Sequence, residues 1–293
     1  MVKDQKERCV YLGLPAFNEE LAIAPLFDRV REAQKTLIGS DNASGLKVLV
    51  YDDGSTDNTA EQVRTHSHDL DVYLLSPQEN GGLGVALRGL FTQFLDQAQR
   101  QDVLVVMDAD DTHDPNQISE LLRRLDQESL DVVIASRYRQ GSKTMGVPAY
   151  RQMLSLGFAA LVKVMLPIRG VLDYSCGYRV YTYEALSQIA MESGFPIQES
   201  GFASMPEVLV RLRQKSLHFG EIPLRLSYDR RLTVSKMRAW ENSRRLLSQT
   251  VNWRLRPSSL ESKQFAGPSS RTWWIASPVK DGKHPEVSAK EIG

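Results

Sequence analysis

The sequence predicts an α/β protein with a single catalytic domain, built on a mostly parallel sheet with helices on both faces. Short apolar runs alternate with segments whose apolar residues recur at helical spacing. This alternation is typical of parallel sheets covered by crossover helices. The chain has 293 residues, 42% of them hydrophobic and 25% charged, which is enough for a full core of this kind.

The predicted elements of the first half follow one another closely. An apolar run from Cys9 to Leu14, ended by Pro15, is the first predicted strand, and apolar residues at helical spacing predict a helix from Glu19 to Leu37. Further strands are predicted at 47–51, 72–75 and 103–107, and further helices at 56–66 and 85–99.

The second half is less regular. A helix at 117–124 and a strand at 132–136 precede a glycine-rich, basic segment, 138–150, which we expect to be a loop. Helices are then predicted at 157–166, 183–191 and 206–215, and strands at 179–181 and near 221–226. We expect residues 1–8 to be a flexible N-terminus, 9–255 to be the domain, and 256–293, rich in Ser, Pro, Gly and Lys, to be a disordered tail.

Composition narrows the class of partner and compartment. The formal net charge is zero, which argues against nucleic-acid binding through a global positive field. Cys9 and Cys176 cannot form a disulfide framework, and the charged N-terminus lacks the apolar core of a signal peptide. The apolar stretch 154–168 is too short to span a bilayer and contains Lys163, so no transmembrane helix is predicted. We therefore expect a cytoplasmic protein, with peripheral contact at the cytoplasmic face of a membrane as an open alternative.

The strongest chemical pattern is Asp108-Ala109-Asp110, directly after the strand predicted at 103–107. Two carboxylates one residue apart at a strand end can reach one divalent cation. Mg²⁺ and Mn²⁺ prefer oxygen ligands and usually combine a few carboxylates with substrate phosphates. A solvated turn is the alternative for this tripeptide alone, but two other acidic motifs at neighbouring strand ends favour a metal site. Asp111 is expected to point elsewhere.

Those two motifs follow the first and second predicted strands. Ligands of such sheets gather at the carboxyl ends of the strands, so Pro15, Asp52 and Asp108 are expected on one rim. Asp52 and Asp53 can accept hydrogen bonds from a base or ribose. A turn with a helix cap at Ser55 or Thr56 is the second interpretation, and both can hold.

The motif from Pro15 to Glu19 allows a similar choice. Asn18 is a candidate helix cap, and Glu19 is a candidate nucleotide contact. Phe17 is either a flat surface for a nucleobase or a core aromatic. The glycine motif Asn80-Gly81-Gly82-Leu83-Gly84 lacks the position and full spacing of a dinucleotide fingerprint, so we interpret it as a tight turn that opens a helix.

Basic residues form the last candidate set. Phosphate-rich substrates need cationic partners besides a metal, and the guanidinium fork suits phosphate. The candidates are Arg137, Arg139, Arg151, Arg179, Arg230, Arg231 and Lys236.

Taken in order, the motifs at 15–19, 52–57, 80–84 and 108–110 resemble family 2 glycosyltransferases of the GT-A fold, which is Rossmann-like. Later segments, Ser136-Arg137-Tyr138, Tyr150-Arg151, the run 173–181, Asp229-Arg230 and Ser235-Lys236, resemble the dolichyl- and polyprenyl-phosphate mannose synthases. The resemblance covers roughly residues 9 to 240. The sequence departs from it at Phe17, Tyr150, Ser175 to Gly177 and Thr233, which bears on sugar and acceptor more than on chemistry.

The resemblance implies roles for particular residues. A nucleotide diphosphate-sugar, GDP-mannose in preference to UDP-glucose, would be held by a set of residues that also includes the metal ligands Asp108 and Asp110. That set is Pro15, Phe17, Glu19, Asp52, Asp53, Asp108, Ala109, Asp110, Arg137, Arg230 and Lys236. Asp108, Asp110 and Arg137 would be the catalytic residues, with Mg²⁺ or Mn²⁺ as cofactor. An acceptor phosphate would contact Arg137, Arg151 and Arg179.

The implied reaction is an inverting transfer of a hexose to a polyprenyl phosphate. A phosphate acceptor is already an anion near neutral pH and needs no base, whereas a sugar hydroxyl needs a carboxylate in reach. Asp173 and Glu207 are the carboxylates to test as bases. Open alternatives are a family 2 glycosyltransferase acting on a soluble hydroxyl acceptor or polysaccharide precursor, a nucleotide-sugar-binding protein without catalysis, and a nucleotidyltransferase.

Overall fold

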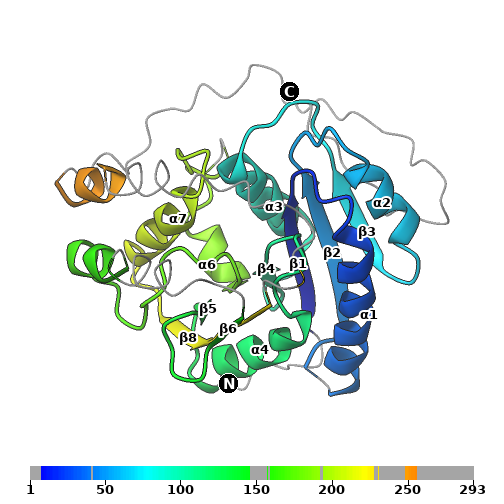
Figure 1. Cartoon of the computed structure of the whole chain (residues 1–293). Coiled ribbons are helices and arrows are strands. Elements are labelled where there is room, and N and C mark those ends of the chain that lie inside the picture. The colour runs from blue at the N-terminus through cyan, green and yellow to red at the C-terminus, as the bar shows by residue number, and fades with distance from the viewer. Residues whose placement is uncertain are drawn as a thin grey trace.

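The computed structural model describes residues 8–40, 42–145, 157, 159–191, 194–227, 230 and 248–255. Seven strands form one sheet in the order β3-β2-β1-β4-β7-β5-β8 (Figure 1). Their bounds are β1 Cys9–Ala16, β2 Gly45–Asp52, β3 Asp71–Leu75, β4 Val103–Val106, β5 Val132–Ser136, β7 Arg179–Thr182 and β8 Phe219–Pro223. All neighbouring strands pair in parallel except β7, which runs antiparallel to β4 and β5. The predicted mostly parallel sheet is confirmed.

Helices cover both faces of this sheet, as predicted (Figure 1). The helices α1 (Ile23–Gly39), α2 (Thr59–His66) and α4 (Ile118–Gln127) lie on one face, and α3 (Leu83–Gln97), α6 (Tyr183–Ser187) and α7 (Ser204–Arg213) lie on the other. The spacing of buried residues explains the packing, since α1 buries one stripe: Ile23, Leu26, Phe27, Val30, Ala33 and Leu37. A short 3-10 helix, η2 (Pro115–Gln117), precedes α4.

The strand register brings the polar motifs to one edge of the sheet. Ala16 at the end of β1 lies opposite Asp52 at the end of β2. Asp108 follows closely on β4, and Arg137 directly follows β5. Because β7 is antiparallel, the chain enters it at this same edge. We call this edge the rim. The ends of β1, β2, β4 and β5 and the start of β7 meet there.

Two parts of the second half differ from the prediction. Within the expected loop 138–150, β6 (Lys143–Met145) pairs in parallel with β9 (Arg225–Ser227), a three-residue strand too short to show a period. The strand predicted near 221–226 is split between β8 and β9, because the chain changes its pairing partner at Leu224: its N–H donates to Ser136 O of β5 at 3.0 Å, and its O accepts Lys143 N–H of β6 at 2.8 Å. The helix predicted at 183–191 ends at Ser187.

The N-terminal boundary also moves. Arg8 is 5% exposed, and its Nη1 lies 2.8 Å from Asp126 Oδ1, so Arg8 belongs to the folded domain rather than to the flexible segment predicted at 1–8. Residues 1–7 and the tail at 256–293 lie outside the described residues. No helix in the described part of the chain has the length and apolar character needed to cross a membrane.

Candidate active site

The turn after β4 carries the predicted metal ligands. The side chain of Asp108 is 46% exposed, and its main-chain N–H donates to His113 Nδ1 at 3.2 Å. Asp110 is 8% exposed, and its Oδ1 accepts the Thr112 hydroxyl at 2.6 Å. Both carboxylates are thus carried by a turn that hydrogen bonds to His113 and Thr112 hold in shape.

The third carboxylate of this turn points away from the first two, as predicted. Asp111 has φ 58°, a left-handed backbone that non-glycine residues seldom adopt. Its Oδ1 accepts Arg29 Nη1 of α1 at 2.5 Å. Burial raises the pKa of Asp111, while Arg29 and, more weakly, Arg230 oppose that shift. The positive φ turns Asp111 toward α1 and Arg29.

The donor chemistry of Asp108 and Asp110 fits a hard divalent cation. Within the described residues, no group of three or more His, Cys, Asp or Glu side chains could hold a metal ion by itself. Two carboxylates, one of them about half exposed, instead match an ion that completes its shell with water and substrate phosphate oxygens. Asp108 and Asp110 are the residues that would hold Mg²⁺ or Mn²⁺.

The Asp52-Asp53 pair is buried at the end of β2. Asp53 Oδ1 and Oδ2 accept the main-chain N–H groups of Gly81 and Gly82 at 2.9 and 2.7 Å. Burial raises the pKa of Asp53, and those two amides oppose the shift. Asp52 Oδ2 accepts the Ser76 hydroxyl at 3.1 Å. The carboxylate of Asp53 therefore anchors the glycine motif in this structure, and the predicted role of the pair in nucleoside binding remains a proposal.

The loops after β1 and β2 are joined by hydrogen bonds. Asn18 Oδ1 accepts Thr56 N–H at 2.7 Å, and Asn18 N–H donates to Ser55 Oγ at 2.8 Å. The predicted helix caps are therefore wrong: α1 and α2 are preceded by Ala22 and Asn58, neither of which makes a side-chain cap. The polar side chains join two rim loops instead.

The other predicted nucleotide contacts of this region lie on the same loop. Pro15 and Phe17 are partly exposed, whereas Glu19 is 7% exposed. Phe17 is therefore not a fully buried core aromatic. Its placement at the rim is compatible with the predicted nucleobase contact.

The glycine motif is explained by a close approach of two chain segments. Gly84 N–H donates to Ser200 O at 2.8 Å, and a Cβ on Gly84 would lie 1.8 Å from Glu199 O. Gly82 has φ 83°, and a Cβ there would lie 2.4 Å from Ser200 O. Only glycine fits these two positions. The predicted tight turn that opens a helix is correct, and the motif also receives the segment at 199–200.

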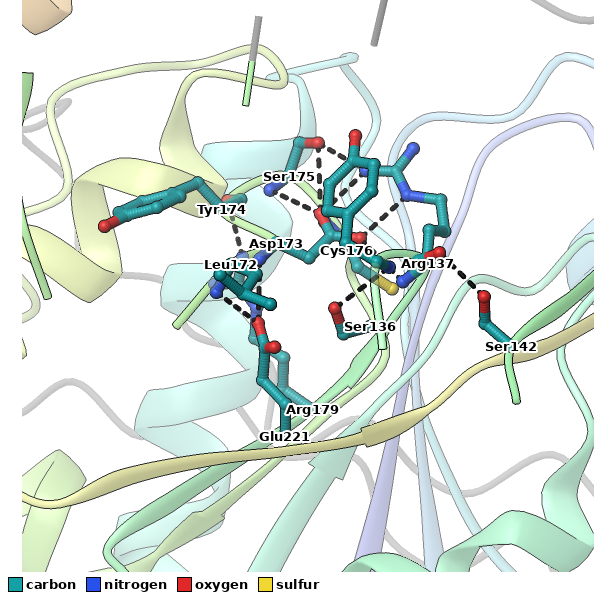
Figure 2. Close-up of polar contacts among 11 residues, drawn as sticks. Ser136, Arg137, Ser142, Leu172, Asp173, Tyr174, Ser175, Cys176, Arg179 and Glu221 are labelled. Carbon is teal, nitrogen blue, oxygen red and sulfur yellow. Dashed lines mark hydrogen bonds and ion pairs between the residues drawn. The ribbon is translucent and has the colours of Figure 1, made fainter. Parts of the chain in front are cut away.

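Arg137 is held by a buried carboxylate (Figure 2). Its Nε and Nη2 donate to Asp173 Oδ2 and Oδ1 at 2.8 and 2.7 Å, and Nη2 also donates to Ser175 Oγ at 2.5 Å. The Arg137 side chain is 29% exposed, whereas that of Asp173 is 0% exposed. Gly177, in the same loop as Asp173, lies beside the metal motif, since a Cβ on it would be 3.0 Å from Asp108 Oδ1. Arg137 and the metal motif are thus joined through one loop.

The assignment of Arg179 to an acceptor phosphate needs correction. Arg179 opens β7 and is 0% exposed, and its Nη1 and Nη2 donate to the main-chain oxygens of Met205 and Tyr174, each at 2.8 Å. A substrate phosphate cannot reach a guanidinium enclosed in this way. Arg179 joins the start of α7 to the loop that enters β7.

The remaining basic candidates are only partly described. Arg230 is exposed, and its positive charge lowers the pKa of the Asp111 carboxyl, which places Arg230 near the turn that carries the predicted metal ligands. Arg151 and Lys236 lie outside the described residues. Ala109 is 2% exposed between the two predicted metal ligands.

Several residues that shape the site were not assigned from the sequence. They are Arg29, His113 and Glu221. Arg29 and Glu221 bind Asp111 and the main chain of Asp173 from distant parts of the sequence, and His113 accepts the N–H of Asp108 within one turn. Glu221 did leave a signal, because it is the single charge within the apolar strand β8. Arg29 and His113 left none that separates them from ordinary surface residues.

Comparisons with known proteins agree with this geometry. Residues 11–189 match the family model described as glycosyl transferase family 2. Undecaprenyl-phosphate mannosyltransferase of Micrococcus luteus is 31% identical over 76% of this chain and 85% of its own length. Polyprenol monophosphomannose synthase of Mycolicibacterium smegmatis is 28% identical over 83% of this chain and 86% of its own. The predicted resemblance to this group is confirmed.

Solved structures share the fold. Glucosyl-3-phosphoglycerate synthase from Mycobacterium tuberculosis, in complex with Mn²⁺, UDP and glucosyl-3-phosphoglycerate, superimposes with a TM-score of 0.57 at 19% identity, over 85% of this chain and 80% of that one. The same enzyme has also been solved with Mg²⁺ and UDP, with a TM-score of 0.55. Together with the family match, the fold shows a GT-A glycosyltransferase domain. The chain therefore belongs to glycosyl transferase family 2.

Proposed function

We propose that this enzyme transfers a hexose, mannose in preference to glucose, from a nucleotide diphosphate-sugar to a polyprenyl phosphate with inversion at the anomeric carbon. Its relatives in Micrococcus luteus and Mycolicibacterium smegmatis are named for mannosyl transfer to polyprenyl phosphate or polyprenol. Asp108 and Asp110 would hold a divalent cation, which would supply charge stabilisation for the leaving diphosphate. Arg137 and Arg230 add positive charge on the same side.

The observation that carries the proposal is the state of the two candidate bases. Asp173 is 0% exposed, and both its oxygens accept hydrogen bonds from Arg137. Glu207 is also 0% exposed; it accepts Glu199 N–H at 2.8 Å and Arg211 Nη2 at 2.7 Å. Neither carboxylate can take a proton from a sugar hydroxyl. A phosphate monoester needs no such base, because its second pKa is about 6 and it is already an anion near neutral pH.

The test is release of nucleoside diphosphate from GDP-mannose and UDP-glucose, with Mg²⁺ or Mn²⁺. Parallel reactions contain polyprenyl phosphate, 3-phosphoglycerate as a soluble hydroxyl acceptor, or no acceptor. The proposal expects release that depends on both metal and polyprenyl phosphate and is fastest with GDP-mannose. Release that depends on 3-phosphoglycerate and ignores the lipid phosphate would favour the soluble-acceptor alternative.

Access to a lipid acceptor is served by exposed apolar side chains on two helical segments. In the segment at 159–165, Val164 is 78% and Leu161 44% exposed, whereas Val162 is 0% exposed. In the segment at 248–255, Leu255 is 74% exposed, whereas Trp253 is 5% exposed and packs in a small apolar cluster. These side chains support peripheral membrane contact.

We expect the double substitution Val164→Asp with Leu255→Asp to reduce flotation with phospholipid vesicles by roughly tenfold or more, because each buried apolar side chain contributes about 1.5–3 kcal/mol. The matched control is Ile38→Asp, at the end of α1, where a 44% exposed apolar residue lies outside both segments. Equal flotation of the double variant and the control would remove this surface from the proposal.

A further inference from the structure

A fully buried carboxylate, that of Asp173, lies beside the Arg137 guanidinium (Figure 2). Besides the two guanidinium contacts, Asp173 Oδ2 accepts the main-chain N–H of Arg137 at 3.1 Å. Asp173 Oδ1 accepts the main-chain N–H groups of Ser175 and Cys176 at 3.2 and 3.0 Å. Every hydrogen-bond partner of these two oxygens among the described residues is a donor, and the side chain is closed to solvent. Asp173 can therefore act on a substrate only through another residue.

The charge of Asp173 is maintained by Arg137. Burial tends to raise the pKa of Asp173, but the adjacent Arg137 guanidinium and the hydrogen bonds outweigh burial and hold the pKa below its usual range. The carboxylate is thus ionised throughout the neutral range. A buried ion without its partner is strongly unfavourable, so the two side chains stabilise each other.

A second buried carboxylate holds the main chain that carries Asp173. Glu221, on β8, is 0% exposed at its side chain. Its Oε1 accepts the N–H groups of Leu172 and Asp173 at 2.6 and 2.7 Å, and its Oε2 lies 3.2 Å from Arg139 Nε. Figure 2 shows the resulting order from Glu221 through Asp173 to Arg137. Glu221 thereby fastens the 172–173 segment to the edge of the sheet.

Arg137 itself keeps a partly exposed guanidinium at the rim. Its Nε and Nη2 donate to Asp173, and Nη2 also donates to Ser175. The guanidinium carbon lies 5.5 Å from the centre of the Tyr138 ring. A guanidinium held on one edge in this way cannot rotate away from the rim. Phosphate recognition by arginine depends on such fixed donor geometry.

We propose that Asp173 and Glu221 are positioning residues for sugar transfer: Glu221 fixes the loop, the loop fixes Asp173, and Asp173 fixes the guanidinium of Arg137. The reaction through which they act rests on the proposed function. The structural coupling between the three residues does not, and it can be measured without any substrate.

Asp173→Asn tests the first step. Asparagine has the same size, but its NH₂ group must face either the Arg137 donors at the Oδ2 position or the donors at the Oδ1 position, so one side of the contact is lost. We expect transfer to fall by roughly 10²-fold, as when one fixed donor is removed from a transition state. The affinity for Mn²⁺ together with GDP should stay within about threefold of wild type.

A double-mutant cycle separates positioning from direct chemistry. If Asp173 acts through Arg137, the variant Arg137→Ala with Asp173→Asn transfers sugar as fast as Arg137→Ala alone. Its unfolding midpoint should also lie above that of Arg137→Ala, because removing the unpaired carboxylate restores stability. Rate losses that multiply, or a double variant no more stable than Arg137→Ala, would overturn the proposal.

Two substitutions test Glu221. Glu221→Gln keeps a carbonyl oxygen for the amides of Leu172 and Asp173, whereas Glu221→Met removes it while retaining most of the volume. We expect the Met variant to approach the rate of Asp173→Asn and the Gln variant to lose much less. Equal rates for the two would exclude the role of Oε1. If wild type itself transfers no sugar, the proposed function fails, and the stability cycle still decides the coupling.

Discussion

Asp110→Asn is expected to lower sugar transfer by at least about 10³-fold, because loss of a metal ligand removes several kcal/mol of charge stabilisation at the leaving diphosphate. Asparagine keeps the volume and an oxygen for the Thr112 hydroxyl, so the turn itself should persist. Asp108→Asn should act in the same direction. The measurement is the steady-state transfer rate against Mn²⁺ concentration, together with Mn²⁺ affinity in the presence of GDP.

Asp111→Asn is the matched control for this prediction. It removes the same charge one residue further along the turn, but Asp111 faces Arg29 rather than Asp108 and Asp110. Its rate should stay within about tenfold of wild type, which corresponds to about 1.4 kcal/mol, because a carbonyl oxygen still accepts the Arg29 hydrogen bond. If Asp111→Asn and Asp110→Asn lost equal activity, net charge rather than metal ligation would explain the effect.

The second large effect is expected at Arg137. Arg137→Ala should lower transfer by roughly 10²- to 10³-fold, the range found when one fixed donor to a developing charge is removed. Arg137→Lys should recover only part of this, because an ammonium group lacks the fork that pairs with Asp173 and a phosphate together. The measurement is the transfer rate at saturating donor, with folding checked by thermal unfolding.

Stability must be followed in the Arg137 series, since Arg137→Ala leaves the Asp173 carboxylate buried without its partner, at a cost of about 3–5 kcal/mol. Arg64→Ala is the control, because Arg64 pairs with Glu61 on the surface of α2, with both side chains exposed, and such pairs contribute about 0–1 kcal/mol. A normal rate for a folded Arg137→Ala variant would show that this guanidinium does not contact the reacting phosphates.

Much of the fold followed from local patterns in the sequence. Strands β1, β2 and β4 and helix α1 were predicted because their apolar residues recur at the period of the element, and the rim motifs were found because each follows a strand end. Element bounds shifted by a few residues, and the short strands β6 and β9 carried too few residues to show a period.

The parts that could not be predicted depend on contacts between distant segments. Asp173 meets Arg137 across 36 residues, and Glu221 meets Asp173 across 48. No local pattern distinguishes a carboxylate committed to such a partner from one open to substrate. Arg179 shows the same limit: the sequence predicts a phosphate ligand at this position, and only the packing around it shows that its donors serve main-chain oxygens.

The proposed reaction requires a phosphate oxygen as the nucleophile. The direct measurement is nuclear magnetic resonance of the product formed from GDP-mannose, polyprenyl phosphate and Mg²⁺ by the wild-type enzyme. The expected product carries mannose on the lipid phosphate with the β configuration, inverted from the α-linked donor. Mannose found on a hydroxyl oxygen, or on phosphate with the α configuration retained, would contradict the base-free inverting mechanism.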